Sequence, residues 1–155
     1  MKSIGFRASP KDVIYAIVEE DKGNFRVTSM EKIRIPASQG VPEQLSYLRT
    51  TIKDIISEYS VSRAGIRTTE ASSRNWSLLR ISIEAVIQEL FCNTTIEKYF
   101  VGQNSSITAK LNLGKKDFKK IVESDEISEC HNVDLTGMDK SEKEAVLVAV
   151  ASLNL

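Results

Sequence analysis

The chain has 155 residues, 41% of them hydrophobic, which suits a single domain with a core of its own. A chain of this length buries roughly two-thirds of its unfolded surface, so it needs no disulfide or metal to fold. Its 21 basic and 21 acidic residues give a net charge of zero, which argues against a strongly basic nucleic-acid-binding protein and an acidic disordered tail. The charge is uneven: residues 1–80 hold every arginine and carry +4, whereas residues 81–155 carry −4.

The cysteines, the histidine and the apolar runs predict the cellular location of the protein and argue against a metal site or a membrane span. Cys92 and Cys130 are too few and too far apart for a disulfide framework, and the N-terminus has no apolar signal segment. No window approaches the ~18 apolar residues of a membrane span. His131 and the neighbouring Cys130 supply only two ligands, whereas a zinc site needs three or four. We therefore expect a cytoplasmic protein with two reduced thiols, no metal site and no membrane partner.

The first 35 residues predict an antiparallel meander. Its three strands are expected at Ser3–Arg7, Asp12–Glu20 and Phe25–Ile35. The second is almost continuously apolar, as a strand buried on both faces is, and the third alternates like a half-exposed edge strand. Short turns separate the strands, at Ser9-Pro10 and at Lys22-Gly23-Asn24.

Helices and strands alternate in the remainder of the chain. In chain order we expect a helix over 42–59, a strand at Arg63–Thr68, a helix over 76–91, a strand at Thr95–Val101, helices near 105–111 and 115–123, a polar loop over 124–137 and a last helix over 138–153. Asn75 or Ser73 is expected to cap the second helix and Trp76 to pack in its first turn. Strands 1, 4 and 5, which helices separate, should be parallel, with the opening hairpins at the other edge of the sheet.

This order of elements resembles the ribonuclease H-like fold, and three motifs resemble its Holliday-junction resolvase branch, the RuvC-like proteins. The first strand ends Ile4-Gly5-Phe6-Arg7 and the fourth ends Ala64-Gly65-Ile66-Arg67, with Asn75 eight residues on; the last helix runs from Ser141 through Glu144 to Ala149. The resemblance covers residues 1–155 as one domain. It implies a three-layer α/β fold with a mixed five-stranded sheet, strand order 3-2-1-4-5 with strand 2 antiparallel, flanked by helices.

The chain departs from this family at the positions that carry its chemistry. In RuvC-like nucleases, acids on strand 1, strand 4 and the last helix hold two divalent metals for phosphodiester cleavage. Here Arg7, Arg67 and Ser141 stand at three of those positions, and only Glu144 keeps a carboxylate. Arginine has no lone pair to offer a metal and stays charged. We therefore expect no catalytic residues and no cofactor.

Two interpretations of these arginines remain open. Arg7 and Arg67 should project together at the carboxyl end of the sheet, where Glu144 or Glu70 can form an internal ion-pair network with them. Alternatively, the cleft binds an anion such as a nucleic-acid backbone or a phosphate-bearing ligand, through residues we expect to be Arg7, Arg67, Arg74 and Arg80. The resulting hypothesis is a non-catalytic binding or interaction module.

Two other functions are weighed against this one. An active nuclease with relocated ligands would hold Mg²⁺ with Glu70, Glu142 and Glu144, with Asp139 as a further candidate ligand. A purely structural or assembly protein, such as a homodimer, would have an exposed apolar patch on a helix face and no anion in the cleft.

Two further charge patterns have an ordinary interpretation. Four lysines surround Phe118 and resemble a phosphate-contacting patch, but this spacing is more typical of a solvated helix face: Lys115, Lys116, Lys119 and Lys120. Arg80 and Glu84, four residues apart, predict a surface ion pair.

Overall fold

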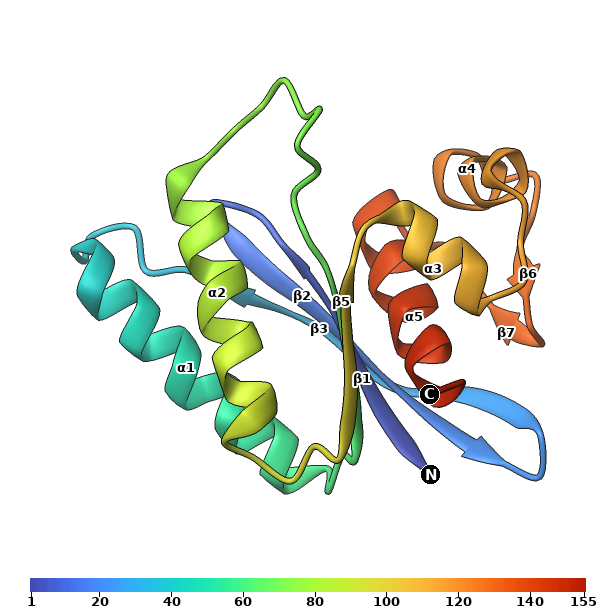
Figure 1. The fold of residues 1–155 in the computed structure, drawn as a ribbon, viewed down its shortest axis with the longest axis horizontal. Helices are drawn as coiled ribbons and strands as arrows, with labels where there is room; N and C mark the ends of the chain where they lie inside the picture. The colour runs from blue at the N-terminus through green and yellow to red at the C-terminus, as the bar shows by residue number, and fades with distance from the viewer.

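The computed structural model describes all 155 residues and places one main β-sheet between two layers of helices (Figure 1). The strands are β1 (Lys2–Ala8), β2 (Asp12–Asp21), β3 (Asn24–Arg34), β4 (Arg63–Arg67) and β5 (Lys98–Gly102), with a small hairpin of β6 (Glu129–Cys130) and β7 (Val133–Asp134). The helices are α1 (Val41–Glu58), α2 (Leu78–Cys92), α3 (Asn104–Lys110), α4 (Lys115–Glu123) and α5 (Lys140–Leu153). None of them is long and apolar enough to cross a membrane.

The sheet has the predicted order, β3-β2-β1-β4-β5. Strands β1, β4 and β5 are parallel, and β2 is antiparallel to both β1 and β3, as expected. Helices α1 and α2 cover one face of the sheet, and α3, α4 and α5 lie on the other (Figure 1). Each face has its own buried apolar cluster, so the sheet separates two cores.

Three local expectations were wrong. Helix α2 begins at Leu78, because the side chain of Ser77 accepts a hydrogen bond from the Arg80 N–H and caps the helix in place of Asn75 or Ser73. Trp76 therefore lies outside the helix and is 60% exposed instead of packed. Strand β5 starts at Lys98, three residues later than predicted.

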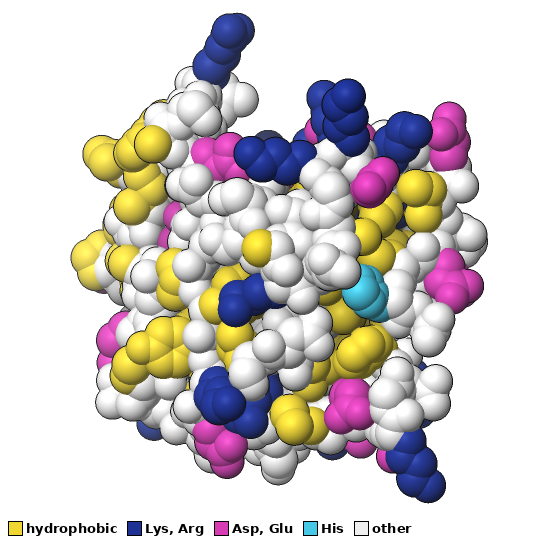
Figure 2. Space-filling model, turned by 45° about the vertical axis from the view of Figure 1, so that its right-hand side comes forward, with side chains coloured by type: hydrophobic (Ala, Val, Ile, Leu, Met, Phe, Trp, Pro, Cys, Tyr) yellow, Lys and Arg dark blue, Asp and Glu magenta, His cyan; other side chains and the backbone are white.

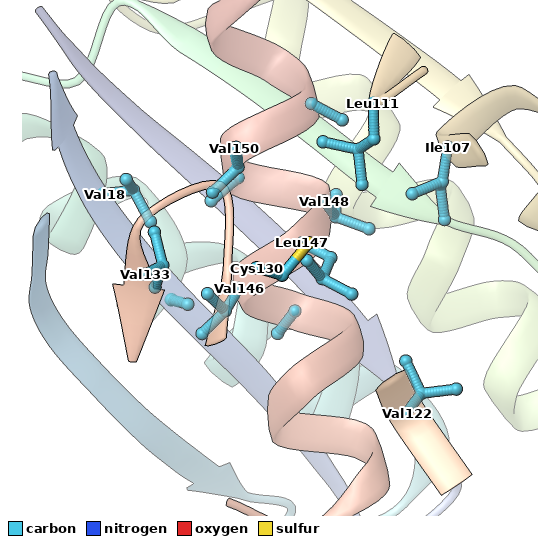
Figure 3. Packing of buried hydrophobic residues seen from close by; sticks show 14 of the residues in the cluster. Val18, Ile107, Leu111, Val122, Cys130, Val133, Val146, Leu147, Val148 and Val150 are labelled. Carbon is cyan, nitrogen blue, oxygen red and sulfur yellow. The ribbon is translucent and has the colours of Figure 1, made fainter. Parts of the chain in front are cut away.

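The region predicted as a polar loop, 124–137, contains the β6–β7 hairpin. His131 and Asn132 both have positive φ angles, which is the backbone of a two-residue hairpin turn. The flanking Cys130 and Val133 point into the core beside α5 (Figure 3). The polar residues around them in the sequence are the reason that this segment was predicted to be a loop.

Helix α5 packs directly on the backbone of β1. Its residues from Lys143 to Ser152 are all buried, and its valines and leucines meet the apolar side chains of α3, α4 and the hairpin (Figure 3). Gly5 makes this approach feasible, since a Cβ there would overlap the carbonyl oxygen of Ala145 and the backbone nitrogen of Ala149. The two glycines of the expected motifs, Gly5 and Gly65, thus lie directly opposite each other on β1 and β4.

Replacing Gly5 with alanine should be strongly destabilising. The new methyl group meets backbone atoms that cannot move without shifting α5, so we expect the free energy of unfolding to fall by about 3 kcal/mol. Gly40→Ala is the matched control, because the one close contact of its new Cβ is with the flexible carboxylate of Glu43, and Pro42 lies at an ordinary van der Waals distance. Urea denaturation followed by circular dichroism measures both. Equal stabilities for the two variants would contradict the proposed contact between α5 and β1.

Candidate functional site

The carboxyl ends of β1 and β4 bring two arginines side by side. Arg7 and Arg67 are direct partners in the parallel register of these strands, which brings them close together as the resemblance implied. Gly102, at the end of β5, lies opposite Arg67 on the other side. Parallel strands end at the same edge of a sheet, so three consecutive strand ends converge here.

Glu144 of α5 joins the two arginines. Its Oε2 accepts one hydrogen bond from Arg7 Nε at 2.5 Å and another from Arg67 Nη1 at 3.1 Å. The Glu144 side chain is 1% exposed, and both arginine side chains are mostly buried. The expected internal ion-pair network is therefore present in the structure.

Two more side chains contact Arg67. Asn104, in the first turn of α3, accepts a hydrogen bond from Arg67 Nε through Oδ1 at 2.6 Å. Glu70 lies 3.8 Å from Arg67 Nη2, which is too long for a hydrogen bond. Sequence reasoning missed Asn104, although its position two residues past the end of β5 is the signal that could have identified it.

The pair of Arg80 and Glu84 belongs to the same region and is not on the surface as predicted. Arg80 Nε donates to Glu84 Oε1 at 3.0 Å, and both side chains are largely buried. The Glu84 carboxylate also accepts hydrogen bonds from the backbone N–H and the hydroxyl of Thr69. Because Thr69 follows the end of β4, this contact ties the face of α2 that carries the ion pair to the sheet.

Burial has the largest effect on the pKa values of Arg67 and Arg80. It lowers the pKa of Arg67 and of Arg80, and the nearby charge of Arg7 lowers both further, while Glu144 opposes the change. Arginine has so high a pKa in water that both side chains remain protonated at neutral pH. Arg7, Arg67 and Arg80 therefore form a cluster of three positive charges, which we call the arginine cluster.

Other predicted residues lie outside the cluster. Arg74 is exposed and makes no ion pair. Glu142 caps a helix instead: its carboxylate accepts a hydrogen bond from the Asp139 N–H in the capping box of α5. The four lysines of α4 are exposed around a buried Phe118, as expected of a solvated face.

A groove of about 420 Å³ adjoins the cluster, and we call it the α3–α4 groove. It is lined by Glu70, Gln103, Asn104, Ser105, Thr108, Lys115, Phe118, Lys119, Val122, Glu123, Lys140 and Glu144. Lys119 and Lys140 are both paired with Glu123, whereas Lys115 has no acidic partner. The lining is mostly polar, and its volume is within the range of small-ligand sites.

The residues at the sheet end do not fit the two divalent metals that a RuvC-like nuclease requires. Arg7 and Arg67 present N–H donors where a metal needs lone pairs, and Oε2 of Glu144 already accepts from both. No three His, Cys, Asp or Glu side chains gather in an arrangement suited to a metal ion.

Comparison with known proteins identifies the fold. No family model and no curated protein sequence matches the chain. Among solved structures, Thermus thermophilus RuvC is similar with a TM-score of 0.74 at 9% identity, covering 99% of this chain and 94% of that chain. The same protein in complex with a Holliday junction substrate gives 0.67 at 9% identity, again over 99% and 94%. Fowlpox virus resolvase with Holliday junction DNA gives 0.53 at 13% identity, over 97% of this chain and 95% of that chain.

The chain therefore has the ribonuclease H-like fold. More narrowly, the match over nearly all of both chains assigns it the RuvC-like form of that fold, as the sequence motifs predicted.

Removing the shared carboxylate should cost more stability than removing an exposed one. Glu144→Ala leaves two buried guanidiniums without their anion, so we expect the free energy of unfolding to fall by about 3–5 kcal/mol. The control Glu89→Ala breaks an exposed ion pair with Arg49 and should leave stability nearly unchanged. Urea titrations compare the two variants, and similar losses would show that Glu144 does not hold the arginines.

Proposed function

We propose that this chain is a non-catalytic RuvC-like domain that binds nucleic acid, with a phosphate of the backbone held at the arginine cluster. The observation that carries this proposal is that each arginine of the cluster leaves part of its hydrogen-bonding capacity unused. Arg7 and Arg67 each donate through Nε and Nη1, and Arg80 donates through Nε alone. The Nη2 group of all three makes no hydrogen bond within the protein.

These unused N–H groups suit a phosphate. The planar fork of arginine matches phosphate oxygens, and charge-assisted hydrogen bonds of this kind are among the strongest in proteins. Arg67 Nη2 has a contact with the carboxylate of Glu70, which is too far for a hydrogen bond and sits on a half-buried, rotatable side chain. An incoming phosphate can take the place of that weak contact without breaking the bonds to Glu144.

The location and the structural relatives favour nucleic acid as the phosphate carrier. In open α/β sheets, ligands bind at the carboxyl ends of the strands, which is where the cluster lies. Two of the similar structures, from Thermus thermophilus and fowlpox virus, were solved with Holliday junction DNA. The non-catalytic part of the proposal rests on the poor fit of the arginines to divalent metals. A cytoplasmic location and a single domain over residues 1–155 remain predictions.

Arg67→Gln should weaken nucleic-acid binding by about tenfold or more, because hydrogen bonds to a charged group are lost. Arg63→Gln is the matched control: Arg63 is equally buried, but it lies at the opposite end of the same strand and pairs with Glu97. Fluorescence anisotropy with labelled branched, duplex and single-stranded DNA and RNA measures the affinity, and circular dichroism confirms folding. If the wild-type protein bound none of these ligands, the proposal would fail.

The alternative of an active nuclease is tested with the same ligands. We expect no cleavage in Mg²⁺ or Mn²⁺ when the products are separated on denaturing gels. Cleavage that disappears in Glu144→Ala would establish a relocated metal site, for which Glu70, Glu142 and Glu144 are the available carboxylates. Cleavage that survives in Glu144→Ala would point to a contaminating nuclease.

A second candidate function, assembly with another copy of the chain, is favoured by an exposed apolar patch. Trp76 is 60% exposed and Leu78 83% exposed at the start of α2, and Tyr99 and Val101 are exposed on the edge strand β5. Apolar side chains gather at the upper left of the face shown in Figure 2. Exposed apolar patches often mark protein interfaces, and most homodimers are two-fold symmetric. Of these residues only Leu78 belongs to a helix, so the patch differs from the helix-face patch that the assembly hypothesis predicted.

If this patch pairs two copies, Trp76→Ser with Leu78→Ser should convert a dimer into a monomer, because the interface loses its largest apolar groups. Size-exclusion chromatography with light scattering measures the mass over a range of concentrations. Val41→Ser with Tyr47→Ser is the control, because it removes two exposed apolar side chains from α1 instead. A wild-type protein that is monomeric at every concentration would rule this candidate out.

A further inference from the structure

One buried oxygen at the site has no hydrogen-bond partner. Glu144 uses Oε2 for both arginines, while its Oε1 is buried and accepts no hydrogen bond. A buried acceptor left unpaired costs about 1–3 kcal/mol, so native structures rarely keep one without a reason. Glu144 also lines the α3–α4 groove, which is the route by which a ligand can supply the missing donor.

The charge around Glu144 restricts what that donor can be. Arg7 and Arg67 lie within hydrogen-bond distance of the same carboxylate, so an ammonium group or a metal ion at Oε1 would face two positive charges. An uncharged O–H or N–H group meets no such repulsion. The matching group on a ligand is therefore a neutral donor.

Asn104 narrows the choice to a hydroxyl group. Its Oδ1 accepts from Arg67, while its amide NH₂ makes no hydrogen bond within the protein. Asn104 lines the same groove as Glu144, and both are hydrogen-bonded to Arg67. A hydroxyl both donates and accepts, so it can donate to Glu144 Oε1 and accept from the Asn104 amide. A base amino group or an ammonium can only donate.

In a nucleic acid, the hydroxyl that lies beside a backbone phosphate is the ribose 2′-OH. We infer that the α3–α4 groove receives a ribose of RNA, with its 2′-OH between Glu144 and Asn104 and the neighbouring phosphate on Arg67. This inference rests on the proposed function, because it takes the phosphate position from the arginine cluster. Lys115 lines the same groove and has no acidic partner, so it is available to contact the next phosphate.

The 2′-OH is the group by which proteins distinguish RNA from DNA, so matched oligonucleotides test the inference. Anisotropy titrations at one salt concentration would compare a single-stranded RNA, the DNA of the same sequence and its 2′-O-methyl form, which keeps the oxygen but has no donor. We expect the RNA to bind about tenfold more tightly than the other two. Equal affinities for all three would overturn the ribose assignment and leave the proposed function standing. No binding of any of them would instead mean that the proposed function fails.

A groove-filling variant tests the location. Ser105→Trp places a large side chain in the groove lining, and we expect it to reduce the RNA affinity to that of DNA. Ser46→Trp adds the same group to an exposed position on α1 and should leave the preference unchanged. An RNA preference that persists in Ser105→Trp would place the ribose outside the groove. AMP binding as tightly as the RNA would show that a free nucleotide, not a strand, is the ligand and would overturn the assignment to RNA.

Discussion

The close packing of α5 on β1 is the constraint on which the rest of the site depends. Gly5 lets the backbone of the helix approach the backbone of the strand, and the helix is buried along most of its length. This fixed position holds Glu144 above the ends of β1 and β4, where one carboxylate oxygen reaches both arginines. A helix held farther from the sheet would leave two buried guanidiniums without an anion, at a large cost in stability.

Charge balance inside the site explains why a chain of zero net charge can still hold a cluster of three arginines. Three arginines are matched by Glu144, Glu84 and the more distant Glu70. The first two glutamates are buried and bonded, so they keep the cluster folded in the absence of ligand. Glu70 makes only a long contact, so it is the charge that a phosphate can replace. A site of this kind is stable when empty and retains unused N–H donors for a ligand.

The residues proposed for binding and for assembly meet at the start of α2. The α3–α4 groove and the contacts of Arg7 and Arg67 with Glu144 lie at the carboxyl ends of the strands, on the α5 side of the sheet, whereas Arg80 belongs to the first turn of α2. The exposed Trp76 and Leu78 lie at the start of α2, which belongs to the opposite layer (Figure 1). A dimer formed through Trp76 and Leu78 would therefore lie next to Arg80, on the other layer from the α3–α4 groove.

The sequence by itself determined the order of helices and strands and, through the resemblance to RuvC-like proteins, the fold, the strand order and the closeness of Arg7 to Arg67. Hydrophobic periodicity, turn residues and the two Gly-containing strand ends are local signals, and adjacent parallel strands must end at the same edge. Only the tertiary structure decided that Asn104 joins the site, that Arg80 and Glu84 are buried and that Arg74 is not involved. It also decided that Ser77 caps α2, which leaves Trp76 in solvent. These outcomes depend on how the helices approach the sheet and on which side chains then become buried. The spacing of residues along one helix or strand carries no information about which residues of other elements will contact it.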